Sequence, residues 1–424
     1  MMDRARLAEG GHTRSRTLAA DSRARRPDPF GALLDEKLRK RFTAGTHRIA
    51  TPGETLARFM PLMHAMGVTR LGLTTGLDFI GIPVAVAVRP NASSIAVSQG
   101  KGWTEPQALA SALMESAELF HAETADGAVL ERATALEGEA VFAPEGGRAL
   151  EWMLGWDLLR QAPCWAPAAN VRLDFRRKPD TDYPGATGTN GLGSGNHLVE
   201  ALCAAICEVA ERDAMAVWHA RPLAARAATR IGRFTIEDAG CAGLLRIFDE
   251  AGFSVAIWNV TSDLGIPAFL AMLRQDRPVH GVQLREFHGS GCHPCPAVAL
   301  SRALTEAAQS RLTRIAGARD DMAEQKPSAE ATIARLLLDG LAAEIAGDFG
   351  AIAGGDGDDL GDDLRWMLQL LEAAGISRVI AFDLTKPALG LPVVRVVIPE
   401  LESSREHPSY VPGPRARRAA AERA

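Results

Sequence analysis

The stretch NHLVEALCAAICEVAERDA, residues 196–214, has the apolar density of a buried helix and still carries several acids. Glu200, Glu208 and Glu211 fall at positions that share one face of a helix, with the small Ala204 between them. Leucine, isoleucine and valine side chains occupy the flanks that must face a core. Burying an unpaired carboxylate costs several kcal/mol or raises its pKa until it is neutral. This helix, expected at about 197–220, therefore needs a partner for its acids.

A second helix repeats the pattern in GKGWTEPQALASALMESAELFHAE, residues 100–123. Thr104 is a good N-cap and Gln107 completes a capping box, which predicts a helix from about 105 to 123. Its Glu115 and Glu118 have the same Glu-x-x-Glu spacing as Glu208 and Glu211. Two alanine-rich helices thus each present a pair of carboxylates.

Two interpretations of these acids stay open on the residues alone. In the first, each acidic face is simply exposed to water. In the second, the two faces meet, and four carboxylates at close range stay ionised together only around cations. Oxygen ligands without organised histidine or cysteine favour Mg²⁺ or Ca²⁺, and clustered Mg²⁺ usually accompanies phosphate.

The loop TGTNGLGSGN, residues 187–196, precedes the first helix and could hold such phosphates. It is not a Walker A loop, because no Gly-Lys-Ser/Thr follows, and it lacks the dinucleotide-binding fingerprint. A glycine loop that opens a helix is nevertheless good geometry for binding an anion. The sequence Gly-Lys-Gly at 100–102, which contains Lys101, repeats the arrangement before the other helix. A third helix, expected at about 296–316, has Arg302, Glu306 and Gln309 on one face and by itself indicates an amphipathic helix with a polar side.

Composition limits the function classes. The 424 residues are 47% hydrophobic and 23% charged with a net charge of −5, which is typical of a folded protein and excludes binding of nucleic acid through a basic face. No apolar run approaches the roughly 18 residues that span a bilayer, so we expect no membrane partner and a cytoplasmic location. Residues 1–30 are arginine-rich without an apolar core and are expected to form a disordered basic arm. A single CxxC, at Cys292 and Cys295, is a weak zinc or redox signal.

The remaining chain predicts an α/β (α+β) protein. We expect residues 31–66 to be largely helical, with a capping box at Thr51 and Glu54. We expect HGSGCHPCP (288–296) and the acidic segment 346–363 to be loops, the latter mobile, and a helix at 364–374. The expected strands lie at 68–75, 82–88, 93–99, 253–260, 266–273, 377–382 and 392–398, with short strands and turns over 129–178.

The segment GTNGLGSGNHLVEALCAAICEVAERDA (188–214) resembles the signature of the YcaO family, an ATP-dependent group that modifies peptide backbones. The segments GTHRIATPGETL, TTGLDFIGIPV, SQGKGWTEPQALASALMESAELF and ALSRALTEAAQSRLTRIAGARDD match other family blocks in order. The resemblance covers most of the chain, from about Lys40 to Glu402, and is strongest to members that act with a TfuA-type partner. It implies a YcaO-type fold, with mixed sheets and helices around a central Mg-ATP cleft. The implied organisation is a catalytic domain over 31–402 and a proline-containing basic tail over 403–424.

The resemblance also implies roles for single residues. It makes Glu115, Glu118, Glu208 and Glu211 the Mg²⁺ ligands. It assigns the bound ATP to Arg48, Thr55, Asn196, Glu200, Arg212 and, with a less secure alignment, Arg311. Arg212 together with Lys101 is expected to balance charge during phosphoryl transfer; the role of Lys101 is our own addition to the family pattern.

The expected activity is ATP-dependent thioamide formation on a peptide or protein substrate, with a TfuA-type partner and a possible homodimer. Azoline-forming members often end in a Pro-x-Pro-x-Pro tail, whereas this sequence has only Pro412-Gly413-Pro414 followed by ten residues. That difference favours thioamide formation. An azoline-forming cyclodehydratase and a non-catalytic ATP-binding accessory protein are the alternatives.

Overall fold

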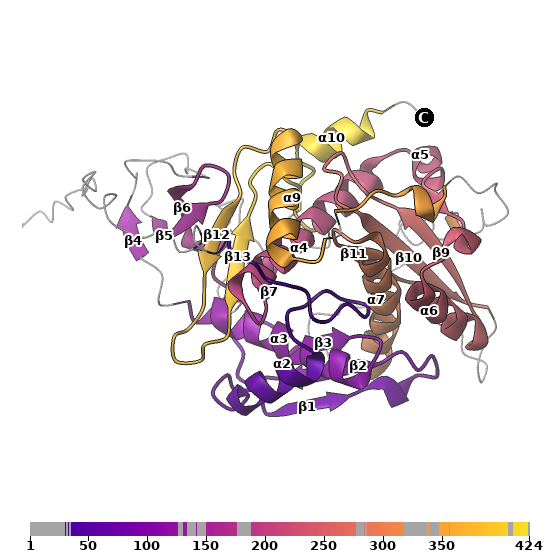
Figure 1. The fold of residues 1–424 in the computed structure, drawn as a ribbon, viewed down its shortest axis with the longest axis horizontal. Coiled ribbons are helices and arrows are strands. Elements are labelled where there is room, and N and C mark those ends of the chain that lie inside the picture. Colours follow the sequence, from indigo (N-terminus) through magenta and orange to yellow (C-terminus); the bar gives the residue numbers. More distant parts are fainter. Residues whose placement is uncertain are drawn as a thin grey trace, which may run out of the picture.

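The computed structural model describes residues 30, 33, 35–125, 130–133, 141, 150–175, 188–276, 284, 286–317, 337–338, 347–355, 357–405 and 410–422. The predicted basic arm therefore lies outside the described residues, except for its last residue, Phe30, which is buried. The described strands form three antiparallel sheets (Figure 1). No helix in the described part of the chain is long and apolar enough to cross a membrane.

The first sheet has three strands in the order β1-β2-β3, namely β1 (Arg70–Leu73), β2 (Val84–Val88) and β3 (Val97–Lys101). The second sheet has the order β11-β10-β9-β8, namely β8 (Arg230–Ile231), β9 (Phe253–Asn259), β10 (Ala268–Gln275) and β11 (Phe287–Cys292). The third sheet has the order β4-β5-β12-β13-β7, with β6 also paired to β5. Its strands are β4 (Leu130–Ala133), β5 (Leu150–Asp157), β6 (Ala162–Pro167), β7 (Leu192–Ser194), β12 (Ile380–Asp383) and β13 (Val393–Val397). The mixed α/β fold class is confirmed.

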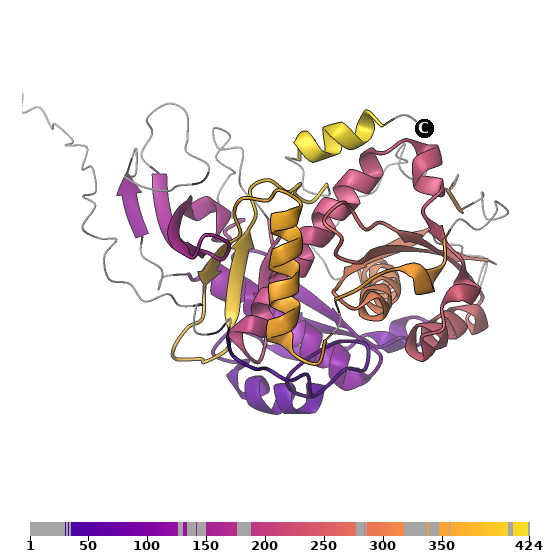
Figure 2. The ribbon, with the colours of Figure 1, turned by 45° about the horizontal axis from the view of Figure 1, so that its top comes forward.

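The helices pack between and outside these sheets (Figures 1 and 2). They are α2 (Pro52–Phe59), α3 (Glu105–Glu123), α4 (Leu198–Ala220), α5 (Leu223–Ala227), α6 (Ala239–Glu250), α7 (Pro296–Ala316), α9 (Leu360–Ala373) and α10 (Pro414–Ala420). Helix α3 packs on β2 and β3 and also touches β7, while α4 packs on β7 and β13 and also touches β11. Helix α7 covers β10 and β11, with α6 beside it. The long acid-bearing helices thus lie at the junctions of the sheets.

The local signals that predicted α3 and α2 are present in the structure. Helix α3 has the predicted bounds, and its capping box joins Thr104 and Gln107 in both directions. The same box joins Thr51 and Glu54 at the start of α2. Helix α4 begins at Leu198, where His197 is the N-cap through its ring nitrogen Nδ1. Short-range hydrogen bonds therefore fix where these helices begin.

Close approach between helix and strand depends on glycine. A Cβ atom added at Gly193 of β7 would lie 2.4 Å from the carbonyl oxygen of Ala201 in α4. The next residue, Ser194, faces the opposite side of the sheet, where its hydroxyl contacts Glu118 of α3. Helices α3 and α4 therefore lie on opposite faces of the β7 edge, and their acids meet beyond that edge.

Two sequence-based expectations are wrong. Residues 37–50 are not helical, because Arg39 pairs with Asp359, Phe42 pairs with Arg48, and Lys40 binds Asp363 through a buried ion pair of 2.7 Å. Most of HGSGCHPCP is strand rather than loop, since residues 288–292 pair with β10.

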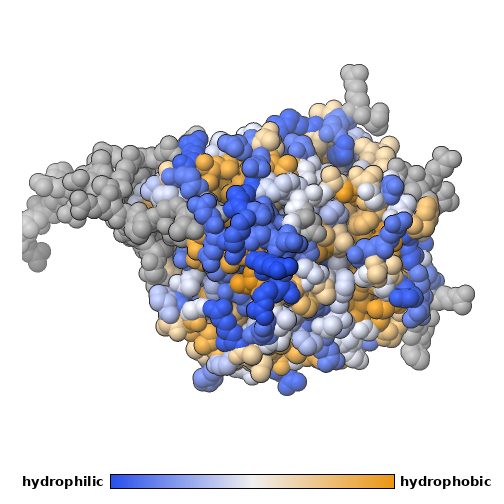
Figure 3. Space-filling model, viewed as in Figure 1, coloured by the Kyte–Doolittle hydropathy of each residue, from blue (hydrophilic) through white to orange (hydrophobic). Residues whose placement is uncertain are grey.

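The acidic segment is largely irregular where it is described, as expected, but α9 begins within it. Asp359 caps α9 through Gly361, so the helix begins at Leu360, four residues earlier than expected. The polar side of α9 is exposed at Asp362, Gln369 and Glu372, and Figure 3 shows hydrophilic residues gathered over this face. The acidic segment and the start of α9 pair with the segment around Lys40, and the local acidic composition did not indicate this tertiary contact.

The expected tail includes a packed helix. Helix α10 lies against α4, and its Arg415 is buried beside Asp213. Residues 406–409 and 423–424 lie outside the described part. The division of the chain at residue 402 stays a prediction.

Candidate active site

The acids of α3 are held by the edges of two sheets. The carboxylate of Glu115 accepts a hydrogen bond from the backbone nitrogen of Gln99 in β3, at 3.1 Å. The carboxylate of Glu118 accepts one from the hydroxyl of Ser194 in β7, at 2.7 Å. Both side chains are half-buried. The face of α3 that carries them is therefore turned inward rather than to bulk water.

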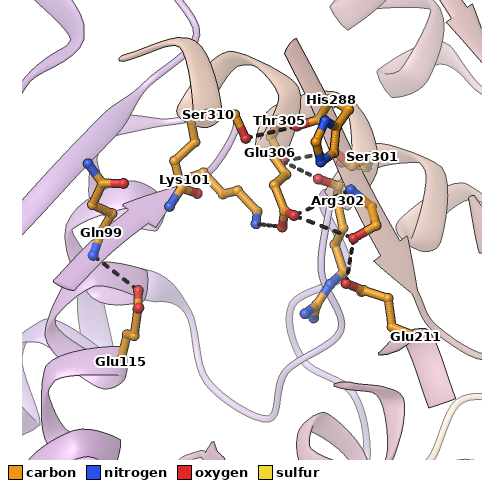
Figure 4. A network of polar contacts seen from close by, with 12 residues as sticks. Gln99, Lys101, Glu115, Glu211, His288, Ser301, Arg302, Thr305, Glu306 and Ser310 are labelled. Carbon is orange, nitrogen blue, oxygen red and sulfur yellow. Dashed lines mark hydrogen bonds and ion pairs between the residues drawn. The ribbon is translucent and has the colours of Figure 1, made fainter. Parts of the chain in front are cut away.

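The acids of α4 lie across from them. Glu211 is buried, and its carboxylate accepts a hydrogen bond from the Ser290 hydroxyl of β11 at 2.7 Å. Arg212 lies 3.5 Å from the same carboxylate. Glu208 is half-buried one turn earlier. Figure 4 shows Glu211 and Glu115 approaching one space from different elements.

Electrostatic coupling shows that the two acidic pairs meet. Burial raises the pKa of Glu118 to about 8, and the charges of Glu208 and Glu115 raise it further. Burial likewise raises the pKa of Glu208 to about 7, with Arg212 acting against it and Glu211 adding to it. Glu118 and Glu208 belong to different helices and repel each other across the gap. The structure therefore favours the interpretation in which the two acidic faces converge.

This acid cluster fits a hard divalent cation by its chemistry. Its donors are carboxylate and hydroxyl oxygens, the ligands that Mg²⁺ prefers, and a cation would relieve the cost of their burial. As the side chains lie in the described residues, no group of three or more histidine, cysteine, aspartate or glutamate side chains is arranged so that it could hold a metal ion. Metal binding by these four glutamates stays a prediction, with the donor set as its support.

A second set of predicted residues forms a polar cluster at the start of α4. The Asn196 side chain donates to the Thr55 hydroxyl at 3.0 Å, which links α4 to α2. Glu200 is buried, accepts hydrogen bonds from the backbone nitrogens of Ile49 and Asn196, and lies 3.7 Å from Arg48. The structure brings together the four residues expected at the nucleotide.

A pocket opens beside this cluster and extends toward the acids. Its free volume is about 10 Å³, which is room for roughly one water molecule. Arg48, Glu200, Ala204 and Arg302 line it, together with Thr46, His47, Cys203, Cys207, His293, Pro294, Leu360 and Asp363. Because Ala204 is the small residue between Glu200 and Glu208, the acidic face of α4 forms part of this wall.

The two residues expected to balance charge lie on different walls. Arg212 of α4 is near Glu211 and Glu208. Lys101 at the end of β3 forms an ion pair with Glu306 of α7 (Figure 4). Both side chains are partly exposed, with 29% and 19% of their surfaces accessible. The two cations come from different elements, and both act to lower the pKa of Glu306.

Arg311 is the predicted residue whose contacts do not support a nucleotide role. It is buried, and its guanidinium donates to Asp78 at 2.8 and 3.3 Å and to Gln275 at 3.2 Å. Phe79 and Phe253 pack against it. It does not line the pocket. Its donors hold α7 against the neighbouring loop and strand, and a nucleotide role for Arg311 stays a prediction.

Sequence reasoning missed several residues around the acids. Arg302 lies on the pocket wall, and although its burial opposes the charged form, Glu211 and other neighbours raise its pKa. Ser194 and Ser290 hold carboxylates of α3 and α4, and Arg395 of β13 is a buried cation near Glu208. The polar face of α7 was the one available signal, and it was interpreted as a solvent-facing side. Serines within short strands carry no comparable signal.

Comparisons with known proteins agree with this geometry. Residues 99–402 match the model of a family described as YcaO cyclodehydratase, ATP- and Mg²⁺-binding. An uncharacterized protein from the tfuA 3′ region of Rhizobium leguminosarum bv. trifolii is 33% identical over 398 residues, covering 86% of this chain and 91% of that protein. An uncharacterized protein of Methanothermobacter thermautotrophicus is 34% identical over 385 residues, covering 85% and 96%.

Solved structures share the fold. YcaO from Methanopyrus kandleri, bound with AMPPCP and Mg²⁺, has a TM-score of 0.70 and 25% identity, covering 89% of this chain and 100% of that one. A heterocyclase in complex with substrate and cofactor has a TM-score of 0.72 at 23% identity, covering 87% of this chain. This chain spans 54% of that heterocyclase, and the likeness there concerns the fold alone.

Proposed function

This chain belongs to the YcaO family, and from that premise we propose that it forms thioamides in a peptide or protein backbone at the expense of ATP. The family binds ATP and Mg²⁺ and carries out ATP-dependent modification of peptide backbones. The observation that carries the proposal is the convergence of Glu118 of α3 with Glu208 of α4 in one buried, mutually repelling cluster. Such a cluster suits Mg²⁺ and the phosphates that accompany it.

We assign the site residues as follows. Glu115, Glu118, Glu208 and Glu211 would hold Mg²⁺, which bridges and neutralises phosphate oxygens when it is bound. Arg48, Thr55, Asn196 and Glu200 would hold the nucleotide, since they form one connected cluster beside the acids. Arg212 and Lys101 would face the charge that develops during transfer.

The chemistry asks for charge neutralisation more than for acid–base groups. In the proposed reaction, a sulfur nucleophile adds to a backbone amide carbonyl, and the resulting oxyanion takes the γ-phosphoryl group of ATP. Phosphate then leaves with the former carbonyl oxygen, and the thioamide remains with ADP. Two cations near the acids, Arg212 on α4 and Lys101 on β3, support this assignment.

The thioamide product and the partner rest on the relative from the tfuA region. Its similarity extends over 86% of this chain, which supports a TfuA-type partner protein and a shared activity. A homodimer and a cytoplasmic location belong to the same proposal. An azoline-forming cyclodehydratase is the second candidate, because the matching family model is described by that activity.

The test combines the purified protein with ATP, Mg²⁺, sulfide, a TfuA-type partner and peptides encoded beside the gene. We expect ADP and a product whose mass gains the difference between sulfur and oxygen. A product that instead loses the mass of one water would support the cyclodehydratase. ATP binding without ADP or any modified peptide would leave only an accessory role.

The variant Glu208→Gln tests the metal site. It should weaken binding of Mg²⁺ with a non-hydrolysable ATP analogue by at least about 10-fold, since second-shell changes alone cost about 10- to 100-fold at metal sites. The matched control is Glu105→Gln, an exposed acid in the first turn of α3. Equal analogue affinity of the wild type and Glu208→Gln would contradict the assignment of the metal ligands.

A further inference from the structure

The site lies at the centre of three similar strand–helix units. Each unit has a glycine in its strand that lies against an alanine of the following helix. A Cβ atom at Gly100, Gly193 or Gly291 would lie 2.2, 2.4 or 2.2 Å from the carbonyl oxygen of Ala108, Ala201 or Ala299, respectively. The three alanines follow their glycines at the same spacing. The units are β3–α3, β7–α4 and β11–α7.

The acids recur at one position of these units. Each helix has a glutamate at the same distance in sequence from the glycine of its unit. The three pairs are Gly100 and Glu115, Gly193 and Glu208, and Gly291 and Glu306. The backbone nitrogen before the glycine donates to this glutamate in two units, from Gln99 to Glu115 at 3.1 Å and from Ser290 to Glu306 at 3.4 Å. Glu306 is therefore the third-unit counterpart of two residues assigned to the metal.

The units also close into a ring. The strand of each unit supplies a polar side chain to an acid on the helix of another: Ser194 to Glu118, Ser290 to Glu211, and Lys101 to Glu306. The packing of β7 on α3, β11 on α4 and β3 on α7 follows the same cycle. The acids of all three helices consequently face one central space, and Figure 4 shows Glu115, Glu211 and Glu306 directed toward it.

The third unit differs from the other two in charge. Where the first two units have a second glutamate, Glu118 and Glu211, the third has Gln309. Where the first two have the small residues Ser111 and Ala204, the third has Arg302. Its one remaining acid, Glu306, already has a cation, Lys101. Burial works to raise the pKa of Glu306, but Lys101 and Arg212 outweigh it and keep the pKa below its usual value. Lys101 therefore balances the charge of Glu306 within the protein.

A wall with one anion and one cation suits a ligand group that has both an acceptor and a donor. The Lys101 and Glu306 side chains retain 19% and 27% exposure, so both are reachable from solvent. A peptide amide presents a carbonyl oxygen to an ammonium group and an N–H group to a carboxylate. We propose that Lys101 and Glu306 bind the amide that is to be modified, Lys101 at its oxygen and Glu306 at its nitrogen. This assignment rests on the proposed function of the site.

The proposed contact has a chemical consequence. When hydrosulfide adds to the carbonyl carbon, the carbon–oxygen π electrons pass to the oxygen, which becomes an oxyanion opposite the Lys101 ammonium. A preorganised donor at such an oxygen contributes about 10²–10³-fold to turnover. Glu306 keeps Lys101 at this position and orients the amide through its N–H. Both residues would thus touch the substrate beside the metal-binding glutamates, since the Ser290 hydroxyl contacts Glu211 at 2.7 Å and Glu306 at 3.4 Å.

The test uses Lys101→Met, Glu306→Gln and Glu306→Asp of the full chain, assayed with the TfuA-type partner, sulfide and the peptide that the wild type modifies. We expect Lys101→Met to lower kcat by about 100-fold and Glu306→Gln to raise the peptide KM by at least about 10-fold. Both variants should keep their affinity for AMPPCP with Mg²⁺ within about 3-fold of the wild type. Glu306→Asp keeps the charge and should recover part of the peptide affinity. Ser310→Ala is the control, since Ser310 joins α7 to His288 of β11 one turn beyond Glu306.

The outcomes separate this inference from the function on which it rests. If Glu306→Gln weakens AMPPCP and Mg²⁺ binding as Glu208→Gln does, Glu306 belongs to the metal site and the amide assignment is overturned. Wild-type kcat and peptide KM in Lys101→Met and Glu306→Gln would overturn it as well. A wild-type protein that binds no AMPPCP and modifies no peptide would instead refute the proposed function. If Glu306→Gln unfolds, Lys101→Met and Glu306→Asp decide the question.

Discussion

At the scale of single residues, the site is defined by acids that the protein itself does not neutralise. Glu118 and Glu208 have pKa values raised to about 8 and about 7, chiefly through burial. A cluster of this kind is costly without a cation, and such perturbed groups are concentrated at functional sites. The cations nearest to it are arginines on three elements, Arg212, Arg302 and Arg395. Their arrangement around the acids explains why charge rather than acid–base chemistry dominates the proposed reaction.

Arg302 of α7 lies on the pocket wall, whereas the sequence indicated only that it belongs to the polar side of an amphipathic helix. Replacing it by methionine should weaken binding of a non-hydrolysable ATP analogue with Mg²⁺ by about 10- to 100-fold, because a hydrogen bond to a charged group contributes about 1.5–3 kcal/mol. Titration calorimetry measures the affinity. Arg314→Met, an exposed arginine on the same helix, should bind as the wild type does. Unchanged affinity in Arg302→Met would remove Arg302 from the site.

His121 gives the fold an acid sensitivity that is independent of the site. It is fully buried, its Nδ1 donates to the Ala117 carbonyl at 2.7 Å, and burial lowers its pKa to about 4. The unfolded chain takes up this proton near pH 6.5 and the folded chain only near pH 4, so stability is lost as pH falls between these values. The full loss is on the order of 3 kcal/mol.

Urea unfolding at pH 7 and pH 4.5 measures this effect. His121→Gln should show a smaller loss of unfolding free energy on acidification than the wild type. The exposed His64 provides the control as His64→Gln, which should retain the wild-type loss. An equal loss in the wild type and His121→Gln would show that other groups cause the acid sensitivity.

At the scale of elements, the segment expected to be a tail is attached to the acid-bearing helix. Glu402 accepts hydrogen bonds from the backbone nitrogens of Gly413 and Ala416, and so holds the start of α10. Arg415 donates to Asp213 at 2.8 and 2.9 Å, and Asp213 follows Arg212 directly in α4. Helix α10 therefore supports the turn of α4 that carries Glu211 and Arg212.

Removal of Arg415 should leave a buried charge without its partner. Asp213 is fully buried, and burial raises its pKa while Arg415 acts against that shift. We expect Arg415→Met to lower the free energy of unfolding by about 3–5 kcal/mol, and the double variant with Asp213→Asn to recover part of it. Arg418→Met, exposed on the same helix, should have little effect in the same urea titration. A loss no larger than that of Arg418→Met would contradict this role.

At the scale of the whole molecule, one site gathers residues from all three sheets. Helix α3 lies on the first sheet, α4 on the third and α7 on the second, and their acids meet at the centre. The hydrophobic clusters around these helices are separate, so the polar centre is where the three parts of the core adjoin. A ligand bound there would contact elements far apart in the sequence.

Ligand binding should consequently stabilise the whole chain. ATP with Mg²⁺ at about 100 times its Kd should raise the free energy of unfolding by about 2.7 kcal/mol, provided that the unfolded chain does not bind it. ATP alone or Mg²⁺ alone should stabilise less, because clustered carboxylates would repel phosphate unless a cation lies between them. Thermal unfolding with each ligand, and with Glu208→Gln as the control, measures the difference. Equal midpoints in all conditions would exclude a Mg-ATP site of this affinity.

The sequence by itself determined the units of this protein. Capping boxes at Thr51 and Thr104 and the alanine-rich acidic helices depend on contacts between near neighbours, so local patterns were enough to place α2, α3, α4 and α7. The paired Glu-x-x-Glu motifs also indicated oxygen-binding cations as one of two open interpretations of the acids. Family resemblance added the nucleotide cluster of Arg48, Thr55, Asn196 and Glu200, which the structure brings together.

Only the tertiary structure decided which polar faces share the site. The face of α7 with Arg302 and Glu306 has the composition of a solvent-exposed side, and Arg311 one turn further has the same type of side chain. Long-range contacts distinguish these residues of α7. Arg311 forms an ion pair with Asp78, whereas Glu306 forms one with Lys101 at the site. The conformation of residues 37–50 and of the acidic segment before α9 likewise depends on long-range ion pairs such as that between Lys40 and Asp363. Such contacts join residues far apart in the chain, and their free energy depends on burial that no local pattern records.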